Sequence, residues 1–184
     1  MATKEGDTIE KHGEFRTTWP EGELTGKFNV CGAVINETVR ALVTFRGPDR
    51  SHEGIVFWGG YQYDGITTIT TVVVPKAKHG PQFVQCDERS IREVSQIFRR
   101  YGLGLLVQVH SHPSEDARHS FGDDRMVFMP FEGMLSLVVP WYAKNGMLPL
   151  SGCGIHQFQK GRWVLCTSGF EAIKILPAGV DTRG

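Results

Sequence analysis

The 184-residue sequence has no excess of charge of either sign, because 20 lysines and arginines balance 20 aspartates and glutamates. It therefore lacks the basic surplus that holds nucleic acid or an anionic membrane surface, and we expect neither as a partner. No apolar run approaches the roughly 20 residues of a membrane-spanning helix. The first residues also contain no apolar stretch typical of a secretion signal. We therefore expect a cytoplasmic protein.

Paired cysteines are missing as well. Cys31, Cys86, Cys153 and Cys166 are far apart, and no two of them form a Cys-x-x-Cys pair. This spacing favours reduced thiols over a disulfide framework. Cys86 has no local signature of a catalytic nucleophile, so we assign it a structural role.

The length and the 40% apolar content suit one folded domain with tails. Residues 1–26 are polar, and we expect a flexible N-terminal tail, or an arm that Trp19 and Pro20 dock on the body. The domain is expected over residues 27–176. Residues 177–184 are expected to form a C-terminal tail.

Local patterns predict a mixture of strands and helices. Asn36 is expected to cap a helix through about residue 45, and Asp87 a helix that ends near Gly102. Asp64 and Gly65 predict a tight hairpin turn. Strands are expected at residues 28–34, 54–61, 66–74, 103–109, 134–139, 152–159 and 162–167, and a short helix from Asp123 to about residue 128. This mixture predicts an α+β fold, a mixed β-sheet flanked by helices.

The most informative stretch of the sequence runs from Leu103 to Asp124. Its apolar start predicts a buried strand that ends in His110 and His112, because Pro113 has no N–H to continue the ladder. Residues two apart on a strand point to the same face, so both imidazoles lie on one side. The following loop contributes the hydroxyl of Ser120 and the carboxylate of Asp123.

Two imidazoles and a carboxylate are suitable ligands for a catalytic zinc ion, which keeps a further position open for water. A bound water in such a site has its pKa lowered to about 7. Other interpretations stay open at this point. Asp124 or Asp116 could replace Asp123 as the ligand, Ser120 could be an ordinary helix cap, and a His-x-His pair alone often only packs or faces solvent.

These residues resemble the JAMM (MPN+) motif of zinc isopeptidases. The matching pattern is His110-Ser-His112-Pro113, a gap that ends at His119, and then Ser120-x-x-Asp123. The family's upstream glutamate precedes a strand, and the segment from Glu53 to Gly60 resembles that part, with Gly60 in register. By order of elements the resemblance covers about residues 28–165, and it implies the MPN/JAB (cytidine-deaminase-like) version of the α+β fold.

The resemblance also implies a chemistry. His110, His112 and Asp123 would hold one Zn²⁺ per chain with a bound water, Glu53 would act as general acid and base, and Ser120 would stabilise the oxyanion. Outside the family pattern, Glu53 could be an ordinary solvated glutamate. His119 lies in the variable gap of the motif, and we expect it on the surface; no partner is expected for His12, His52, His79 or His156.

The implied substrates are ubiquitin-like proteins or their conjugates, cleaved after the C-terminal glycine for deconjugation or maturation. The compact spacing is similar to that of small bacterial JAB proteins, which often accompany ubiquitin-activating or ubiquitin-conjugating-like enzymes, including some in anti-phage defence. Two alternatives are a non-catalytic MPN-type scaffold, whose hallmark is loss of the ligands, and a zinc peptidase that acts on sulfur-carrier conjugates.

Overall fold

The computed structural model describes residues 18–126 and 130–179. Along the chain these residues form β1 (Glu21–Glu23), β2 (Lys27–Cys31), α1 (Gly32–Leu42), β3 (Ile55–Tyr63), β4 (Ile66–Val73), β5 (Lys78–Gly80), β6 (Phe83–Gln85), α2 (Glu88–Arg100), β7 (Gly104–Ser111), α3 (Phe121–Asp124), β8 (Leu135–Val139), β9 (Gly154–Gln159), β10 (Arg162–Ser168) and β11 (Ile173–Leu176). Short 3-10 turns occupy Trp141–Ala143, Leu150–Gly152 and Phe170–Ala172. None of the helices in these residues has the length and apolarity that a membrane span requires.

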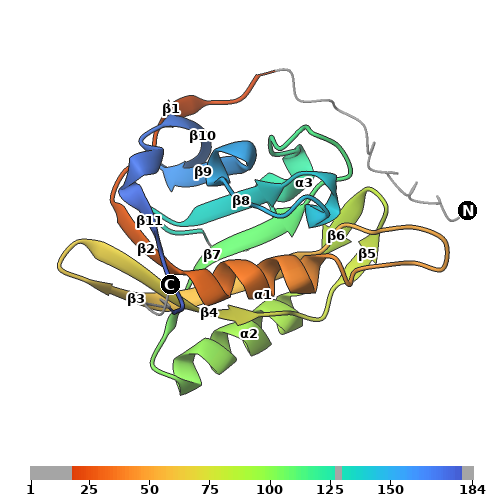
Figure 1. Ribbon diagram of the computed structural model, residues 1–184, viewed down its shortest axis with the longest axis horizontal. Coiled ribbons are helices and arrows are strands. Elements are labelled where there is room, and N and C mark those ends of the chain that lie inside the picture. The colour runs from red at the N-terminus through yellow and green to blue at the C-terminus, as the bar shows by residue number, and fades with distance from the viewer. Residues whose placement is uncertain (1–17, 127–129, 180–184) are drawn as a thin grey trace, which may run out of the picture.

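The centre of the fold is a nine-stranded sheet in the order β1-β10-β9-β8-β7-β3-β4-β2-β11 (Figure 1). Parallel pairs such as β7 with β8 occur in it together with antiparallel pairs such as β3 with β7. A separate two-stranded hairpin is formed by β5 and β6. The predicted α+β fold with a mixed sheet is confirmed.

The two long helices cover opposite faces of this sheet. On β3, Val56 and Trp58 are buried in one core cluster, which includes residues of α1, whereas Ile55 and Phe57 are buried in the other, which includes Val94 and Phe98 of α2. Alternation of side chains along a strand requires this division. The polar tip of Trp58 is satisfied, since its indole N–H donates to Thr38 Oγ1 at 2.7 Å.

Two of the predicted local features are confirmed. Asp87 caps α2 by accepting a hydrogen bond from Ser90 N–H at 2.7 Å. The hairpin between β3 and β4 turns at Asp64 and Gly65, which both have positive φ angles of 49° and 72°. Positive φ at both central residues is typical of the turn that matches the twist of paired strands.

The first helix differs from the prediction. It begins at Gly32, directly after β2, and ends at Leu42, so Asn36 lies inside it rather than at its cap. Its N-cap residue makes no side-chain hydrogen bond. Val34, Ile35, Thr38 and Leu42 are its buried residues, and burial of this face outweighs the missing cap because packing dominates helix stability in proteins.

Both described ends of the chain add strands at the edges of the sheet that were not predicted. Within the expected N-terminal tail, β1 pairs parallel with β10, and Leu165 N–H donates to the carbonyl oxygen of Pro20 at 2.8 Å. At the other end, β11 pairs parallel with β2. Such short edge strands depend on backbone pairing, which leaves little pattern in the sequence.

The division into a domain over residues 27–176 and two tails remains a prediction. The short helix expected from Asp123 to about residue 128 is wrong in its bounds, because α3 begins at Phe121 and ends at Asp124. Residues 127–129 lie outside the described residues.

Gly60 gives a test of this architecture. The register of β3 against β4 shifts between Gly59 and Gly60, and a Cβ atom on Gly60 would lie 1.9 Å from the carbonyl oxygen of Thr68. We expect Gly60→Ala to lower the free energy of unfolding by about 2 kcal/mol or more, as overpacking against backbone does. Urea unfolding followed by circular dichroism measures this. Gly152→Ala is the control because nothing lies within 4 Å of its added Cβ, and equal stability of the two variants would contradict the close approach.

Candidate metal centre

Three side chains that can bind a metal meet at the end of β7. His110 Nε2 lies 3.3 Å from Asp123 Oδ1, and His112 Nε2 lies 3.3 Å from Asp123 Oδ2. The two imidazole Nε2 atoms are 3.2 Å apart. All three ligand atoms fall within 4.8 Å of one another, so the group could hold a metal ion.

The turn at the start of α3 fixes the carboxylate of Asp123. Ser120 N–H donates to Asp123 Oδ2 at 2.7 Å, and Asp123 N–H donates to Ser120 Oγ at 3.2 Å. This reciprocal pair is a capping box. The Ser120 hydroxyl uses only a lone pair in it, so its own proton stays available for a further hydrogen bond.

The two alternative aspartates have other partners. Asp124 Oδ1 lies 2.9 Å from His119 Nδ1, and the Asp116 carboxylate accepts two side-chain hydrogen bonds from Arg118, each at 2.8 Å. Of the three candidates, only Asp123 belongs to the metal-binding group found among the described residues. The geometry therefore favours Asp123 as the carboxylate ligand.

The donor set fits a divalent cation such as zinc. His112 Nδ1 lies 2.7 Å from the carbonyl oxygen of Asp116, and a carbonyl can only accept, so Nδ1 carries the proton and Nε2 keeps its lone pair toward the group. Zinc ligands are usually oriented by such a hydrogen bond.

The charges of the site also favour a cation. Burial alone would raise the pKa of Asp123, but the imidazoles, His110 first, hold it well below the ordinary carboxyl range. Burial would lower the pKa of His112, but Asp123 raises it above its ordinary value. The site therefore stabilises positive charge between its ligands.

Glu53 is buried beside this group, with an exposed fraction of 6%. Its N–H donates to the carbonyl oxygen of Gly80 at 2.9 Å. The next residue, Gly54, is held on both sides by Ser111: Gly54 N–H donates to Ser111 Oγ, and Ser111 N–H donates to the carbonyl oxygen of Gly54, both at 3.0 Å. The alternative of a solvated glutamate is thus wrong. Burial raises the pKa of the Glu53 carboxyl from 4.5 to about 7; His112 opposes this rise and Asp123 adds to it.

A left-handed turn supports the backbone around His112. Trp141, Tyr142 and Ala143 all have positive φ angles, of 56°, 54° and 59°. Each such residue costs roughly 1–2 kcal/mol when it is not glycine. Tyr142 N–H donates to the carbonyl oxygen of His112 at 2.8 Å, and the Tyr142 hydroxyl donates to the carbonyl oxygen of Pro81 at 2.9 Å. This strained turn therefore ties the ligand strand to the β5–β6 hairpin.

His119 is buried, with an exposed fraction of 1%, so its expected surface position is wrong. It stacks on His156 with ring centroids 3.7 Å apart, and its Nε2 lies 2.8 Å from Ser136 Oγ. His156 also accepts the His119 N–H at 3.2 Å. One signal could have revealed this network: the buried polar residues Gln108, Ser136 and His156 lie in register across β7, β8 and β9.

Two other histidines also have a partner that the sequence did not indicate. The Nδ1 atoms of His52 and His79 lie 2.9 Å apart. This contact joins the segment before Glu53 to β5. His12 lies outside the described residues.

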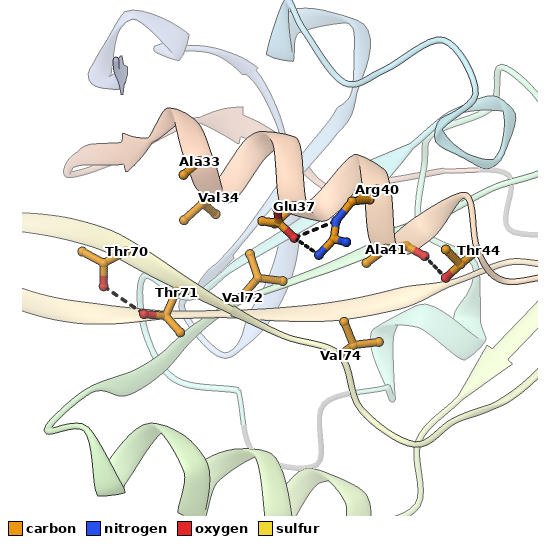
Figure 2. Close-up of a pocket in the computed structure, with 10 residues that line it drawn as sticks. All are labelled: Ala33, Val34, Glu37, Arg40, Ala41, Thr44, Thr70, Thr71, Val72 and Val74. Atoms are coloured by element: carbon orange, nitrogen blue, oxygen red, sulfur yellow. Dashed lines mark hydrogen bonds and ion pairs between the residues drawn. The ribbon is translucent and has the colours of Figure 1, made fainter. Parts of the chain in front are cut away.

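The groove in Figure 2 is separate from this centre. It has a volume of about 540 Å³ and lies between α1 and β4, with Glu37 and Arg40 forming an ion pair on its helical side. None of the five candidate site residues contributes to its lining. The chemistry of the chain is therefore expected at the end of β7 and not in this groove.

Comparisons with known proteins agree with this geometry, although no family model matches the chain. The chain is 34% identical to a probable metalloprotease (y4jG) of Sinorhizobium fredii over 112 residues, which are 59% of this chain and 68% of that protein. It is 30% identical to the mouse AMSH-like protease over 93 residues, but these are only 21% of that protein. A solution structure of a Desulfitobacterium hafniense protein has a similar fold, with a TM-score of 0.60 at 18% identity over 82% of this chain and 95% of that one.

A mixed sheet that brings two histidines and an aspartate together beside a buried glutamate fits a metal-dependent hydrolase. The chain belongs to the JAMM (MPN+) family of metalloproteases.

The raised pKa of Glu53 predicts a pH-dependent stability of the metal-free protein. A carboxyl whose pKa is higher in the folded state stabilises the fold fully below its unfolded pKa, and this contribution is lost as pH rises through the folded pKa of about 7. Glu53→Gln removes the titration, so its stability relative to wild type should improve between pH 4.5 and 8 by up to about 3 kcal/mol. Urea unfolding in the presence of chelator at several pH values measures the difference. The control is Glu93→Gln, in an exposed ion pair with Arg89, which should stay within about 0.5 kcal/mol at all pH values. A flat difference for Glu53→Gln would contradict the raised pKa of this carboxyl.

Proposed function

We propose that this chain is a zinc-dependent peptidase or isopeptidase that hydrolyses the amide bond after the C-terminal glycine of a ubiquitin-like protein. The observation that supports this best is the meeting of His110, His112 and Asp123 next to the buried carboxyl of Glu53. Two neutral nitrogen ligands and one carboxylate are a ligand set used by catalytic zinc. A scaffold that had lost its chemistry would have no reason to retain all of these groups.

When bound by His110, His112 and Asp123, the zinc ion would polarise the scissile carbonyl and acidify a water molecule. Glu53 then takes a proton from the attacking water and gives it to the nitrogen of the leaving amine. A carboxyl with a pKa of about 7 suits both directions of this transfer near neutral pH. The nucleophile is water, so no covalent intermediate with the protein forms.

Ser120 supplies a hydrogen bond to the carbonyl oxygen as it becomes negative. Its role as helix cap does not prevent this, because the cap uses a lone pair and not the hydroxyl proton. The side chain is exposed, which permits contact with a substrate. Ser120 is therefore both a structural and a catalytic residue in this proposal.

The extended C-terminal tail of the substrate binds along the β5–β6 hairpin, within the segment from residue 75 to residue 86. Glu53 and Tyr142 tie this hairpin to the site through the carbonyl oxygens of Gly80 and Pro81. Phe83 on β6 is half exposed and offers an apolar contact. Addition of an extended peptide as a further strand at the edge of a hairpin or sheet is a common recognition mode. The family resemblance further predicts ubiquitin-activating or ubiquitin-conjugating-like enzymes as partners, and a bacterial ubiquitin-like or anti-phage defence pathway.

Metal removal and two substitutions test the metal centre and its base. Incubation with a ubiquitin-like fusion should give cleavage after the terminal glycine, and chelator should abolish it. His110→Ala should lose both metal and cleavage, whereas Glu53→Gln should keep metal and lose at least about 100-fold in rate, because a general base is removed. Metal analysis and gel assays measure both properties, with Glu93→Gln as the unchanged control.

Four results would contradict parts of this proposal. One zinc per chain in His110→Ala would exclude the ligand assignment, and full activity of Glu53→Gln would exclude its role as base. A chain that binds no metal would be a scaffold. A chain that binds zinc but cleaves only sulfur-carrier conjugates would have the same chemistry on a different substrate.

Ser120 is expected to affect rate and stability separately. Ser120→Ala removes both the cap and the donor, so it should cost about 1 kcal/mol of stability and about 10²–10³-fold in kcat, with metal still bound. Asp124→Asn is not a suitable control because it disturbs the His119 contact, but Ser120→Thr retains the hydroxyl and should recover most of the rate. Activity of Ser120→Ala within twofold of wild type would leave Ser120 with its structural role alone.

A further inference from the structure

The residues that precede the domain proper form a strap, here defined as residues 18–24. The strap is fixed to the far edge of the sheet by pairing of β1 with β10, and Leu24 N–H donates to the carbonyl oxygen of Ser168 at 3.1 Å. Leu24 is also buried in the core, with an exposed fraction of 4%. The strap is thus a firm anchor and not a free tail.

From this anchor Trp19 reaches the loop that joins His112 to α3. Its indole N–H donates to the carbonyl oxygen of His119 at 2.7 Å. The guanidinium carbon of Arg118 lies over the indole ring, 4.0 Å from its centroid. One side chain therefore holds two consecutive residues of the loop, the first by a cation–π contact and the second through its backbone.

Arg118 extends this connection to a metal ligand. Its Nε and one terminal nitrogen donate to the two carboxylate oxygens of Asp116, each at 2.8 Å. The backbone carbonyl of Asp116 then accepts the hydrogen bond from His112 Nδ1 at 2.7 Å. The contacts run without interruption from Trp19 through Arg118 and Asp116 to His112.

We propose that Trp19 is a positioning residue for the metal ligand His112, and that the strap is part of the active site's support. This inference rests on the metal centre of the proposed function. It assigns to residues 18–24 a role that their polar sequence did not reveal.

The exposure of the ion pair explains why the anchor is needed. The side chains of Arg118 and Asp116 have exposed fractions of 47% and 48%. An exposed ion pair of this kind stabilises a loop only weakly by itself, because solvent competes for both groups. The indole face removes one side of Arg118 from water and restricts its orientation. Without Trp19 the Asp116 carbonyl is held only by the exposed contacts of its own loop, so it orients His112 less firmly.

The test is metal affinity of the full chain, measured with Co²⁺ by its visible absorption. Outer contacts of metal ligands typically change affinity by about 10–100-fold, so Trp19→Ala should weaken Co²⁺ binding by roughly tenfold. Trp19→Phe keeps the ring under Arg118 and loses only the N–H donor, so its loss should be smaller. Ile69→Ala is the matched control for loss of stability: it removes a fully buried side chain on β4, six strands away from β1 in the sheet, and should leave affinity within about twofold.

A double substitution separates positioning from general loss of stability. Arg118→Ala interrupts the same connection from the loop side. The loss of Co²⁺ affinity in Trp19→Ala combined with Arg118→Ala should therefore be smaller than the two single losses added as free energies, because residues of one network are not additive. If Trp19→Ala does not fold, the Co²⁺ affinity of Arg118→Ala tests the proposal instead, and it should be weaker than that of the wild type. Unchanged affinity in Trp19→Ala, equal losses in Trp19→Ala and Ile69→Ala, or additive losses in the double variant would each overturn the proposal. Wild-type protein that binds no Co²⁺ would overturn the proposed function, and this inference with it.

Discussion

The site depends on the pairing of β7 with β3, at the end of β7 and the start of β3. Ser111 and Gly54 exchange backbone and hydroxyl hydrogen bonds at 3.0 Å, so the residue between the two histidines holds the residue after Glu53. Because side chains alternate along β7, His110 and His112 are on one face, and Ser111 is left to make this backbone contact. A slip of one residue in this register would turn both imidazoles away from Asp123 and separate them from the glutamate. The pairing of β7 with β3 therefore determines which side chains meet in the site.

The electrostatics of the site are balanced only when positive charge is present. The Asp123 carboxylate and the Glu53 carboxyl are both buried, and Asp123 raises the pKa of Glu53. Buried charges are expensive unless they are paired. Burial lowers the pKa of His112, but Asp123 raises it above its ordinary value, so a proton is favoured where a divalent cation would act. Metal binding and proton release are thus linked in this site, as they are whenever ligands must be deprotonated.

Sequence reasoning succeeded where the signal is local and failed where it depends on tertiary contact. The capping aspartate of α2, the turn at Asp64 and Gly65, and the spacing from His110 to Asp123 each depend on a few neighbouring residues. The start of α1 at Gly32 and the edge strands β1 and β11 depend on burial and backbone pairing with distant segments, which leave no periodic pattern. His119 is the clearest failure. A histidine in a polar loop is normally exposed, and only the row of polar residues on β7, β8 and β9 explains why this one is buried.

Asp123 and Asp124 are adjacent acids with different tasks, and helix geometry explains the difference. Consecutive residues on a helical turn point roughly 100° apart. When Asp123 faces the two imidazoles, Asp124 is directed to the other side, where its carboxylate meets His119 at 2.9 Å. His119 in turn contacts Ser136 of β8, so the second aspartate fastens α3 to the sheet while the first serves the metal centre. The loop is therefore held at three points, by Trp19 at Arg118 and His119, by the capping box at Ser120, and by Asp124 through His119. Asp123, which lies on the short helix after this loop, is in this way held in a fixed position. His110 is held directly by β7.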